Sequence, residues 1–189
     1  MTSMEKLWGI VGMKISNYNR IIIIGNNGSG KSFLSKEIAI ITGLPLFHLD
    51  VLFWRPNWEK PSKEEWVKKQ IELTSAEKWI IDGNHSDTME LRYQSADLII
   101  LLDINRLICM YSVFIRNTKK RSDMPSYLKE RFNREYFHFL MGVWNYSKTR
   151  KLAIMDLHRK YPDKPLLVID SRRKMNALLK EWRTSAAIQ

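Results

Sequence analysis

Hydrophobic and polar positions alternate between two patterns along the chain. Five short and nearly continuous apolar runs predict buried β-strands, because a strand covered on both faces presents no polar side. These runs are 21–24, 46–50, 78–82, 98–103 and 166–170. Between them, apolar residues recur at three- and four-residue steps, as in helices that bury one face. The helices predicted from this spacing are 33–41, 63–75, 86–92, 105–118, 126–161 and 172–183. Strands that alternate with helices predict an α/β domain of three layers around a parallel sheet.

Short signals mark where some of these helices begin and end. Ser62 and Glu65 are spaced as in a capping box, and Gly43 and Pro45 follow the first helix and stop it. The expected buried positions are Trp66, Val67, Ile71 and Leu73 in helix 63–75, and Leu128, Phe132, Tyr136, Phe139, Leu140, Val143 and Trp144 in helix 126–161. The spacing of the second set favours core packing over a nucleic-acid surface.

The first apolar run leads directly into a glycine-rich turn. Gly25, Gly30, Lys31 and Ser32 match the phosphate-binding pattern G-x-x-x-x-G-K-[ST], between a strand and a helix as the pattern requires. Glycines let the backbone approach a phosphate, the lysine reaches the β- and γ-phosphates, and the serine hydroxyl binds Mg²⁺. A glycine turn that binds nothing is the weaker alternative. The residues expected to bind ATP are Gly25, Asn26, Asn27, Gly28, Ser29, Gly30, Lys31, Ser32 and Phe33.

The second, third and fourth apolar runs end on carboxylates that are candidates for the site, at Asp50, Asp82 and Asp103. The carboxyl ends of parallel strands meet at one edge of the sheet, so these acids are predicted to surround the phosphate loop. Asp82 or Asp103 is expected to hold Mg²⁺ together with Ser32. Asp50 is a candidate to position or deprotonate an acceptor hydroxyl, or else an acid that caps the next turn. His48 lies on the same face of its strand, where a structural role is favoured.

An aromatic segment follows the second predicted strand. It contains Trp54 and Trp58, which either contact a substrate or pack the segment onto the body of the domain. We expect the acceptor-binding region over about residues 51–77. The residues predicted to contact the acceptor are Asp50, Trp54, Asp82, Gly83, Asn84 and Arg92. For Arg92 the alternative is an ordinary surface arginine.

A cationic segment at about 116–126 follows the helix after the fourth strand. Arg116 and Arg121 are predicted to close over the transferring phosphoryl group, together with Lys31 as a catalytic cation. This segment is therefore expected to form a lid, and a solvated loop is the equally weighted alternative.

Composition limits the number of domains and the classes of partner, but it does not indicate a specific function. The 189 residues are expected to form one domain over 20–189, with an N-terminal extension at 1–19. The chain has 31 Lys and Arg residues and 20 Asp and Glu residues, so its net charge is +11. This charge is compatible with binding to nucleic acid, to an anionic membrane surface or to polyphosphate substrates. A lone cysteine, Cys109, excludes an internal disulfide, so a cytoplasmic location is expected. No apolar run approaches the length of a membrane span.

Several motifs together resemble a known family. They are Ile23-Ile24-Gly25 with the glycine loop, His48-Leu49-Asp50 with Leu52-Phe53-Trp54, Trp79 to Asn84, Leu101-Leu102-Asp103, and Arg121 to Met124. Over about residues 20–184 the chain is similar to the adenylate-kinase-related P-loop proteins called DNA topology modulation protein, or FlaR. The resemblance implies a fold of the nucleoside monophosphate kinase type, with strand order 2-3-1-4-5 and a lid after the fourth strand.

The resemblance also narrows the expected chemistry. The implied strand order puts the third strand beside the first, which favours Asp82 over Asp103 for the metal. Asn84 and His85 stand where adenylate kinases have a Phe-Pro-Arg continuation, which argues against an adenylate acceptor. We therefore expect transfer of a phosphoryl group from ATP to a small acceptor, such as a nucleotide or nucleoside. The alternative is a DNA-associated regulator that uses nucleotide binding as a switch. Nucleic acid is the less favoured partner.

Overall fold

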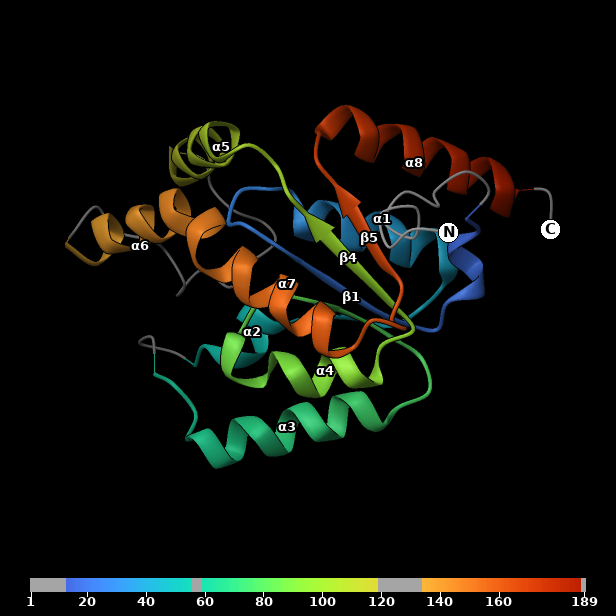
Figure 1. Ribbon diagram of the computed structural model, residues 1–189, viewed down its shortest axis with the longest axis horizontal. Helices are drawn as coiled ribbons and strands as arrows, with labels where there is room; N and C mark the ends of the chain where they lie inside the picture. Colours follow the sequence, from blue (N-terminus) through green and yellow to red (C-terminus); the bar gives the residue numbers. More distant parts are fainter. Residues whose placement is uncertain (1–12, 56–58, 119–133, 188–189) are drawn as a thin grey trace.

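A five-stranded parallel sheet forms the centre of the computed structural model, which describes residues 13–55, 59–118 and 134–187 (Figure 1). The strands are β1 (Arg20–Gly25), β2 (Leu46–His48), β3 (Trp79–Asp82), β4 (Leu98–Leu102) and β5 (Leu166–Ile169). Their order across the sheet is β2-β3-β1-β4-β5, which confirms the predicted topology. The register pairs Asp82 with Ile23 on one side and with His48 on the other. The end of β3 is thus fixed between the ends of β1 and β2.

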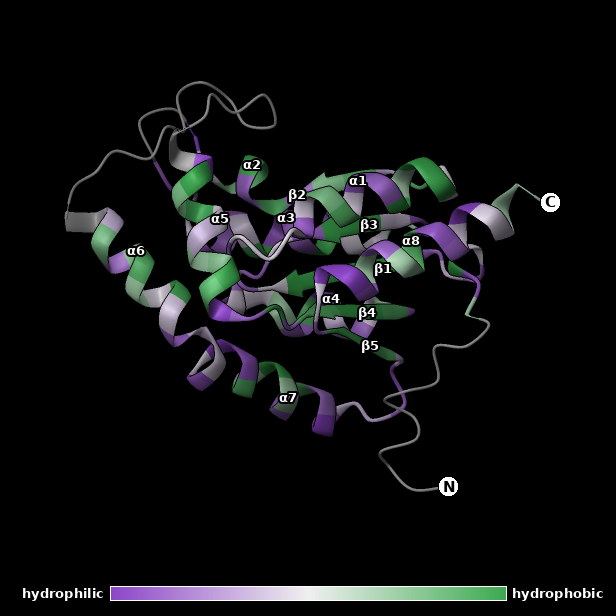
Figure 2. Ribbon diagram, turned by 90° about the horizontal axis from the view of Figure 1, so that it is seen from above, coloured by the Kyte–Doolittle hydropathy of each residue, from purple (hydrophilic) through white to green (hydrophobic). Residues whose placement is uncertain are grey.

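Helices cover both faces of the sheet. One face packs against α1 (Lys31–Thr42), α5 (Arg106–Thr118), α6 (Arg134–Asn145) and α8 (Arg172–Ala186). The other face packs against α2 (Leu49–Phe53), α3 (Lys63–Ser75), α4 (Met89–Ser95) and α7 (Arg150–Lys160). Successive isoleucines of β1 point to opposite faces, as the pleat of a strand requires. Figure 2 shows that the strands of the sheet, such as β4 and β5, are coloured as hydrophobic.

Short 3₁₀ turns connect several of the elements. They are η2 (Ile15–Asn17), η4 (Ser86–Thr88) and η5 (Tyr146–Lys148). The described part of the N-terminal extension packs onto the domain, because Ile15 is buried and the Trp182 indole donates a hydrogen bond of 3.0 Å to the Met13 carbonyl.

Three local predictions need correction. The second strand ends at His48, and Asp50 lies in the first turn of α2 rather than at the end of a strand. The helix predicted over 126–161 is interrupted at Thr149, whose φ of −128° and ψ of −85° are not helical. In α3, Gln70 is buried and Ile71 is exposed, because Gln70 has a buried partner described below.

Other local predictions are confirmed. Helix α3 has the predicted bounds, and the Ser62–Glu65 capping box is present with both hydrogen bonds. In α6, Tyr136 and Val143 are buried as predicted, whereas Trp144 is partly exposed. Leu128 and Phe132 lie outside the described residues. Within the described parts of the chain, no helix combines the length and the apolar character that a membrane crossing needs.

Candidate active site

The phosphate loop owes its shape to glycine at three positions. Gly25, Gly28 and Gly30 have φ values of 151°, 78° and 102°, which side chains other than glycine rarely adopt. A Cβ on Gly28 would lie 2.4 Å from the Cys109 carbonyl oxygen of α5, and one on Gly25 would lie 2.6 Å from the Leu102 carbonyl oxygen. The loop is therefore packed backbone against backbone onto β4 and α5.

Asparagine side chains hold the loop in place. Asn26 is buried, and its Nδ2 donates a hydrogen bond of 2.8 Å to the Val143 carbonyl of α6. Its Oδ1 accepts a hydrogen bond of 2.8 Å from the Asn27 amide. Asn84, after β3, bonds both backbone groups of Gly25: its Oδ1 accepts from the Gly25 amide at 3.1 Å, and its Nδ2 donates to the Gly25 carbonyl at 2.8 Å. These contacts attach the loop to α6 and to the turn after β3.

Helix α1 begins directly after the loop, with Gly30 as its N-cap. The amides of a first helical turn have no partner within the helix and carry partial positive charge, so this end of α1 suits a phosphate. Lys31 is the first residue of the helix, and its Nζ donates to the Gly25 and Asn26 carbonyls at 3.1 Å each. The ammonium therefore lies across the loop.

The electrostatic surroundings of Lys31 bring several predicted residues together. Burial lowers the pKa of the Lys31 ammonium, and the carboxylates of Asp82 and Asp50 are the largest influences in the opposite direction. The charge of Arg116, in the last turn of α5, acts on both Lys31 and Asp50. Lys31, the two carboxylates and Arg116 therefore lie close enough together for their charges to interact.

Asp82 is buried and has one carboxylate oxygen without a hydrogen-bond partner among the described residues. Its side chain is 5% exposed, and its Oδ2 lies 2.8 Å from Nδ1 of His48. Its Oδ1 is buried without a hydrogen-bond partner among the described residues. Ser32 offers a hydroxyl from the first turn of α1, and these oxygen donors fit Mg²⁺. In the described ranges no three His, Cys, Asp or Glu side chains cluster as a metal site. Phosphate oxygens and water would complete the set, as is usual for Mg²⁺.

Asp103, the other candidate for the metal, has a different neighbourhood. It follows β4, and its Oδ2 lies 2.5 Å from Nζ of Lys151 on α7. Its charge acts on Cys109 and Tyr146. Asp103 is thus engaged in an ion pair between β4 and α7, which leaves Asp82 as the better candidate.

Asp50 is paired with a histidine, His85, that was not among the predicted site residues. Its Oδ1 lies 3.3 Å from Nε2 of His85, and its side chain is 59% exposed. Partial burial raises the pKa of this carboxyl, but the His85 hydrogen bond and the charges of Lys31 and Arg116 lower it by more, so the net shift is downward. Asp50 is an exposed and ionised carboxylate facing the cations of the loop.

The position of His85 is itself determined by packing. Its backbone has a φ of 36°, in the left-handed region, and its ring lies 4.6 Å from that of Phe53 and 5.1 Å from that of Trp66. Gly83, two residues earlier, has a φ of 140°, and a Cβ there would lie 2.8 Å from Cβ of Leu49. The turn after β3 therefore packs closely against α2. The only sequence feature that could have indicated His85 as a site residue is its position in the turn after the third predicted strand, directly after Asn84.

Arg92 does not lie where the sequence suggested. The side chain has no exposed surface, and its guanidinium donates to Gln70 Oε1 and Thr88 Oγ1 at 2.8 Å each and to the Asn84 carbonyl. Burial lowers the pKa of Arg92 to about 9, so the side chain remains charged at neutral pH. In this structure Arg92 holds the turn that carries Asn84 and is not placed to grip an acceptor.

The remaining predicted residues lie at the edges of the site or outside the described chain. Phe33 is 49% exposed in the first turn of α1. Trp54 packs edge-on against Phe53 with ring centroids 5.0 Å apart, and Lys60 Nζ lies 5.6 Å from the centroid of its ring. Trp58 and Arg121, with most of the predicted lid, lie outside the described residues.

Comparisons with known proteins support the fold. No family model matches the sequence, and no curated protein matches it. Among solved structures, a shikimate kinase from Acinetobacter baumannii is similar over 93% of this chain and 97% of its own, with a TM-score of 0.57 and 11% identity. A shikimate kinase from Bacteroides thetaiotaomicron matches 90% of this chain and 99% of its own, at TM-score 0.50 and 14% identity. A gluconokinase from Sinorhizobium meliloti 1021 matches over 93% of this chain and 94% of its own, at TM-score 0.50 and 13% identity. The chain has the fold of the P-loop kinases.

Proposed function

We propose that this protein transfers the γ-phosphoryl group of ATP to a hydroxyl group of a small-molecule acceptor. One observation carries the proposal. Lys31 of the phosphate loop shares its surroundings with two carboxylates, Asp82 and Asp50, that come from separate parts of the chain. A loop that only bound nucleotide would not need a second, exposed acid.

Each residue has a role that its geometry supports. The loop amides and Lys31 bind the triphosphate, and Ser32 with Asp82 would hold Mg²⁺. The ion would neutralise charge on the β- and γ-phosphate oxygens. The acceptor oxygen attacks the γ-phosphorus, the bond from that phosphorus to the β,γ-bridging oxygen breaks, and ADP leaves. Asp50 accepts the acceptor's proton. Arg116 stabilises the charge on the phosphoryl group in transit.

The pKa of Asp50 suits this role in one respect. A carboxylate with a lowered pKa is a weak base, but it is fully ionised at neutral pH and so always ready to accept a proton. In a loose phosphoryl-transfer transition state, the proton moves when the new oxygen–phosphorus bond is forming, and a weak base is then sufficient.

Similarity to other proteins supports the class of reaction and leaves the acceptor open. The similar solved structures include shikimate kinases and a gluconokinase, which phosphorylate small hydroxylated molecules according to their names. The sequence motifs resemble the FlaR group of adenylate-kinase-related proteins, and we propose membership of that group. We do not propose an adenylate acceptor, because Asn84 is bonded to the loop and Arg92 is buried.

The test is a coupled ADP-release screen with Mg²⁺ over nucleosides, nucleotides and small hydroxylated metabolites. We expect turnover with at least one class of acceptor, and loss of that turnover in Lys31→Ala. Lys36→Ala, which alters an exposed lysine on the same helix, is the matched control and should retain activity. Full ATP turnover in Lys31→Ala would show that the phosphate loop is not the catalytic site.

A further inference from the structure

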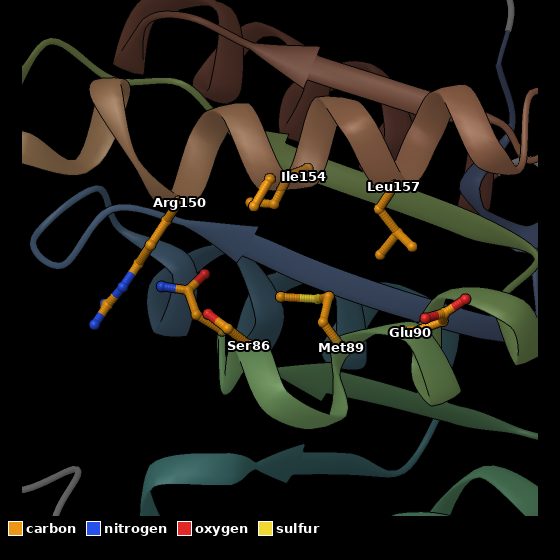
Figure 3. Close-up of a pocket in the computed structure, with 8 residues that line it drawn as sticks. Ser86, Met89, Glu90, Arg150, Ile154 and Leu157 are labelled. Carbon is orange, nitrogen blue, oxygen red and sulfur yellow. The ribbon is translucent and has the colours of Figure 1, made fainter.

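A cavity of about 180 Å³ lies between α4 and α7, with η4 at one end. Figure 3 shows that Ser86 and Met89 face Ile154 and Leu157 across it. Arg150 lies at the end of the cavity marked by Ser86, and Glu90 lies at the opposite end. The predicted acceptor residues did not include the α7 side of this cavity.

The middle of the cavity is apolar. Met89 and Ile154 are buried core residues, and Leu157 continues the wall along α7. An apolar cavity of roughly 150 Å³ is known to hold a benzene ring. The space here therefore suits one ring-sized body and is smaller than the pockets of roughly 300 Å³ or more that hold drug-sized ligands.

The two ends of the cavity differ in charge. Glu90 is already neutralised, because its carboxylate lies 2.5 Å from Nζ of Lys160 and 2.6 Å from the Tyr161 hydroxyl. Arg150 forms no hydrogen bond or ion pair with the residues that the structure describes. Its neighbour Lys151 is bound to Asp103 instead. The Arg150 end therefore has an uncompensated positive charge.

The position of Arg150 strengthens that charge. Arg150 is the first residue of α7, and the first turn of this helix contains no acidic residue. A cation at a helix N-terminus is unfavourable for the helix, because the helix dipole is positive there. The guanidinium of Arg150 and the positive end of the α7 dipole therefore lie together. Both would be stabilised by a bound oxyanion.

One residue, Asn84, connects the cavity with the phosphate loop. Asn84 lines the cavity and bonds to the backbone of Gly25. We infer that the cavity binds the acceptor and that the acceptor is a small hydroxylated organic anion. Its carboxylate or phosphate group pairs with Arg150, its ring-sized body lies against Met89 and Ile154, and its hydroxyl faces the loop. This inference rests on the proposed kinase function and adds the class of acceptor.

A binding experiment without ATP tests the inference separately from turnover. The probes are benzoate, phenyl phosphate and benzamide, which share a ring and differ in charge, titrated into the full chain and followed by NMR. We expect at least one of the two anions to bind about tenfold more tightly than neutral benzamide and to shift the methyl signals of Met89 and Ile154. Comparison of the two anions shows whether a carboxylate or a phosphate is preferred. Equal affinities for benzamide and both anions would overturn the inference.

Variants locate the binding. Arg150→Gln should reduce the affinity for the preferred anion about tenfold, to that of benzamide, whereas Arg159→Gln, at an exposed arginine on the same helix, should not. Ala153→Phe should block the cavity, whereas Leu152→Phe, at an exposed position of α7, should leave binding unchanged. Unchanged anion affinity in both Arg150→Gln and Ala153→Phe would place the probe elsewhere and contradict the inference.

Turnover separates the two proposals. With an active acceptor from the ADP-release screen, Arg150→Gln should raise the acceptor KM about tenfold and leave the KM for ATP unchanged. If the active acceptors are uncharged and Arg150→Gln does not alter their KM, the kinase proposal stands and the inference about the acceptor fails. If no acceptor gives turnover, the kinase proposal fails. The binding data then decide only whether the cavity binds small organic anions.

Discussion

The proposed nucleotide side and the proposed acceptor side of the site are built in different ways. The nucleotide side is one continuous segment, Gly25 to Ser32, whose shape depends on glycine backbone angles and on contacts to β4, α5 and α6. The acceptor side combines Asp50 of α2, His85 of the turn after β3 and Arg150 of α7. These residues are far apart in sequence, and only the fold brings them to one edge of the sheet.

The difference indicates where specificity resides. Backbone amides and one lysine recognise phosphates in any nucleotide, so the nucleotide side can stay constant while the acceptor changes. Side chains on separate elements can each be altered without disturbing the loop. We therefore expect substitutions on the nucleotide side to abolish activity with every acceptor, and substitutions on the acceptor side to alter the rate or KM for the acceptor.

The largest effect is expected at Lys31. Lys31→Met should lower kcat/KM by roughly 10³-fold with all acceptors, because a preorganised cation at the transferring group is removed. The thermal stability of the protein should not fall, because burial disfavours the charged form of Lys31 and the substitution removes that buried charge. Steady-state kinetics and thermal unfolding test both statements. A loss confined to one acceptor would contradict the assignment of Lys31 to the nucleotide side.

The next effect is expected at Asp50. Asp50→Asn should reduce kcat by roughly 10²-fold with little change in the KM for ATP, because the proton acceptor is lost and the triphosphate site is intact. The matched control is Asp170→Asn, which alters an exposed acid after β5 and should retain activity. An increase in the KM for ATP without a change in kcat would assign Asp50 to nucleotide binding instead.

Asp82 and Asp103 are expected to differ in their effect on the Mg²⁺ requirement. Asp82→Asn should raise the Mg²⁺ concentration needed for half-maximal activity by roughly 10- to 100-fold, because its free Oδ1 is a proposed ligand. Asp103→Asn should leave the Mg²⁺ requirement unchanged and only lose the ion pair with Lys151. Mg²⁺ titrations of both variants decide between them. The reverse result would move the metal to the β4 side.

A smaller effect, with a pH signature, is expected at His85. The His85 hydrogen bond lowers the pKa of Asp50, so its loss raises that pKa and Asp50 becomes protonated at a higher pH. His85→Asn, which tolerates the left-handed backbone, should lose about tenfold in kcat and show an acid limb of kcat/KM that is moved to higher pH. The exposed His138→Asn is the control. Identical pH profiles for His85→Asn and wild type would leave His85 with a packing role only.

The smallest effect concerns a glycine outside the site. Gly142 of α6 has no atom near the position of a Cβ, so Gly142→Ala should stabilise the protein by roughly 0.5–1 kcal/mol and leave activity unchanged.

The contrasting substitution in the loop, Gly28→Ala, should destabilise the protein and lower its activity, because the added Cβ would overlap the Cys109 carbonyl and the φ of Gly28 is positive. Denaturant unfolding measures both. A stable and active Gly28→Ala protein would mean that the loop does not need its glycine backbone.

Much of the fold could be predicted because its signals are local. The apolar runs gave the strands, and the capping box at Ser62 and Glu65 gave the start of α3. The phosphate loop could be predicted for the same reason, since its residues are adjacent. The break at Thr149 was missed because no glycine or proline stands near it to mark the end of a helix.

The acceptor side was less predictable because it depends on tertiary contacts. Arg92 has the sequence character of a surface arginine and is buried only because Gln70, Thr88 and the Asn84 carbonyl meet there. The pairing of His85 with Asp50 joins residues 35 positions apart. The cavity beside Arg150 needs α4 and α7 to be neighbours, and no spacing within either helix indicates that.

The most direct test of the central claim follows the γ-phosphate itself. ATP, Mg²⁺ and an acceptor that supports ADP release are incubated with the protein, and the products are resolved by ³¹P NMR. Our account predicts that the γ-phosphorus appears as a phosphomonoester of the acceptor, and that it does not do so with Lys31→Met. Release of the γ-phosphate only as inorganic phosphate, or binding of ATP with no turnover, would contradict it and would favour a nucleotide-dependent switch.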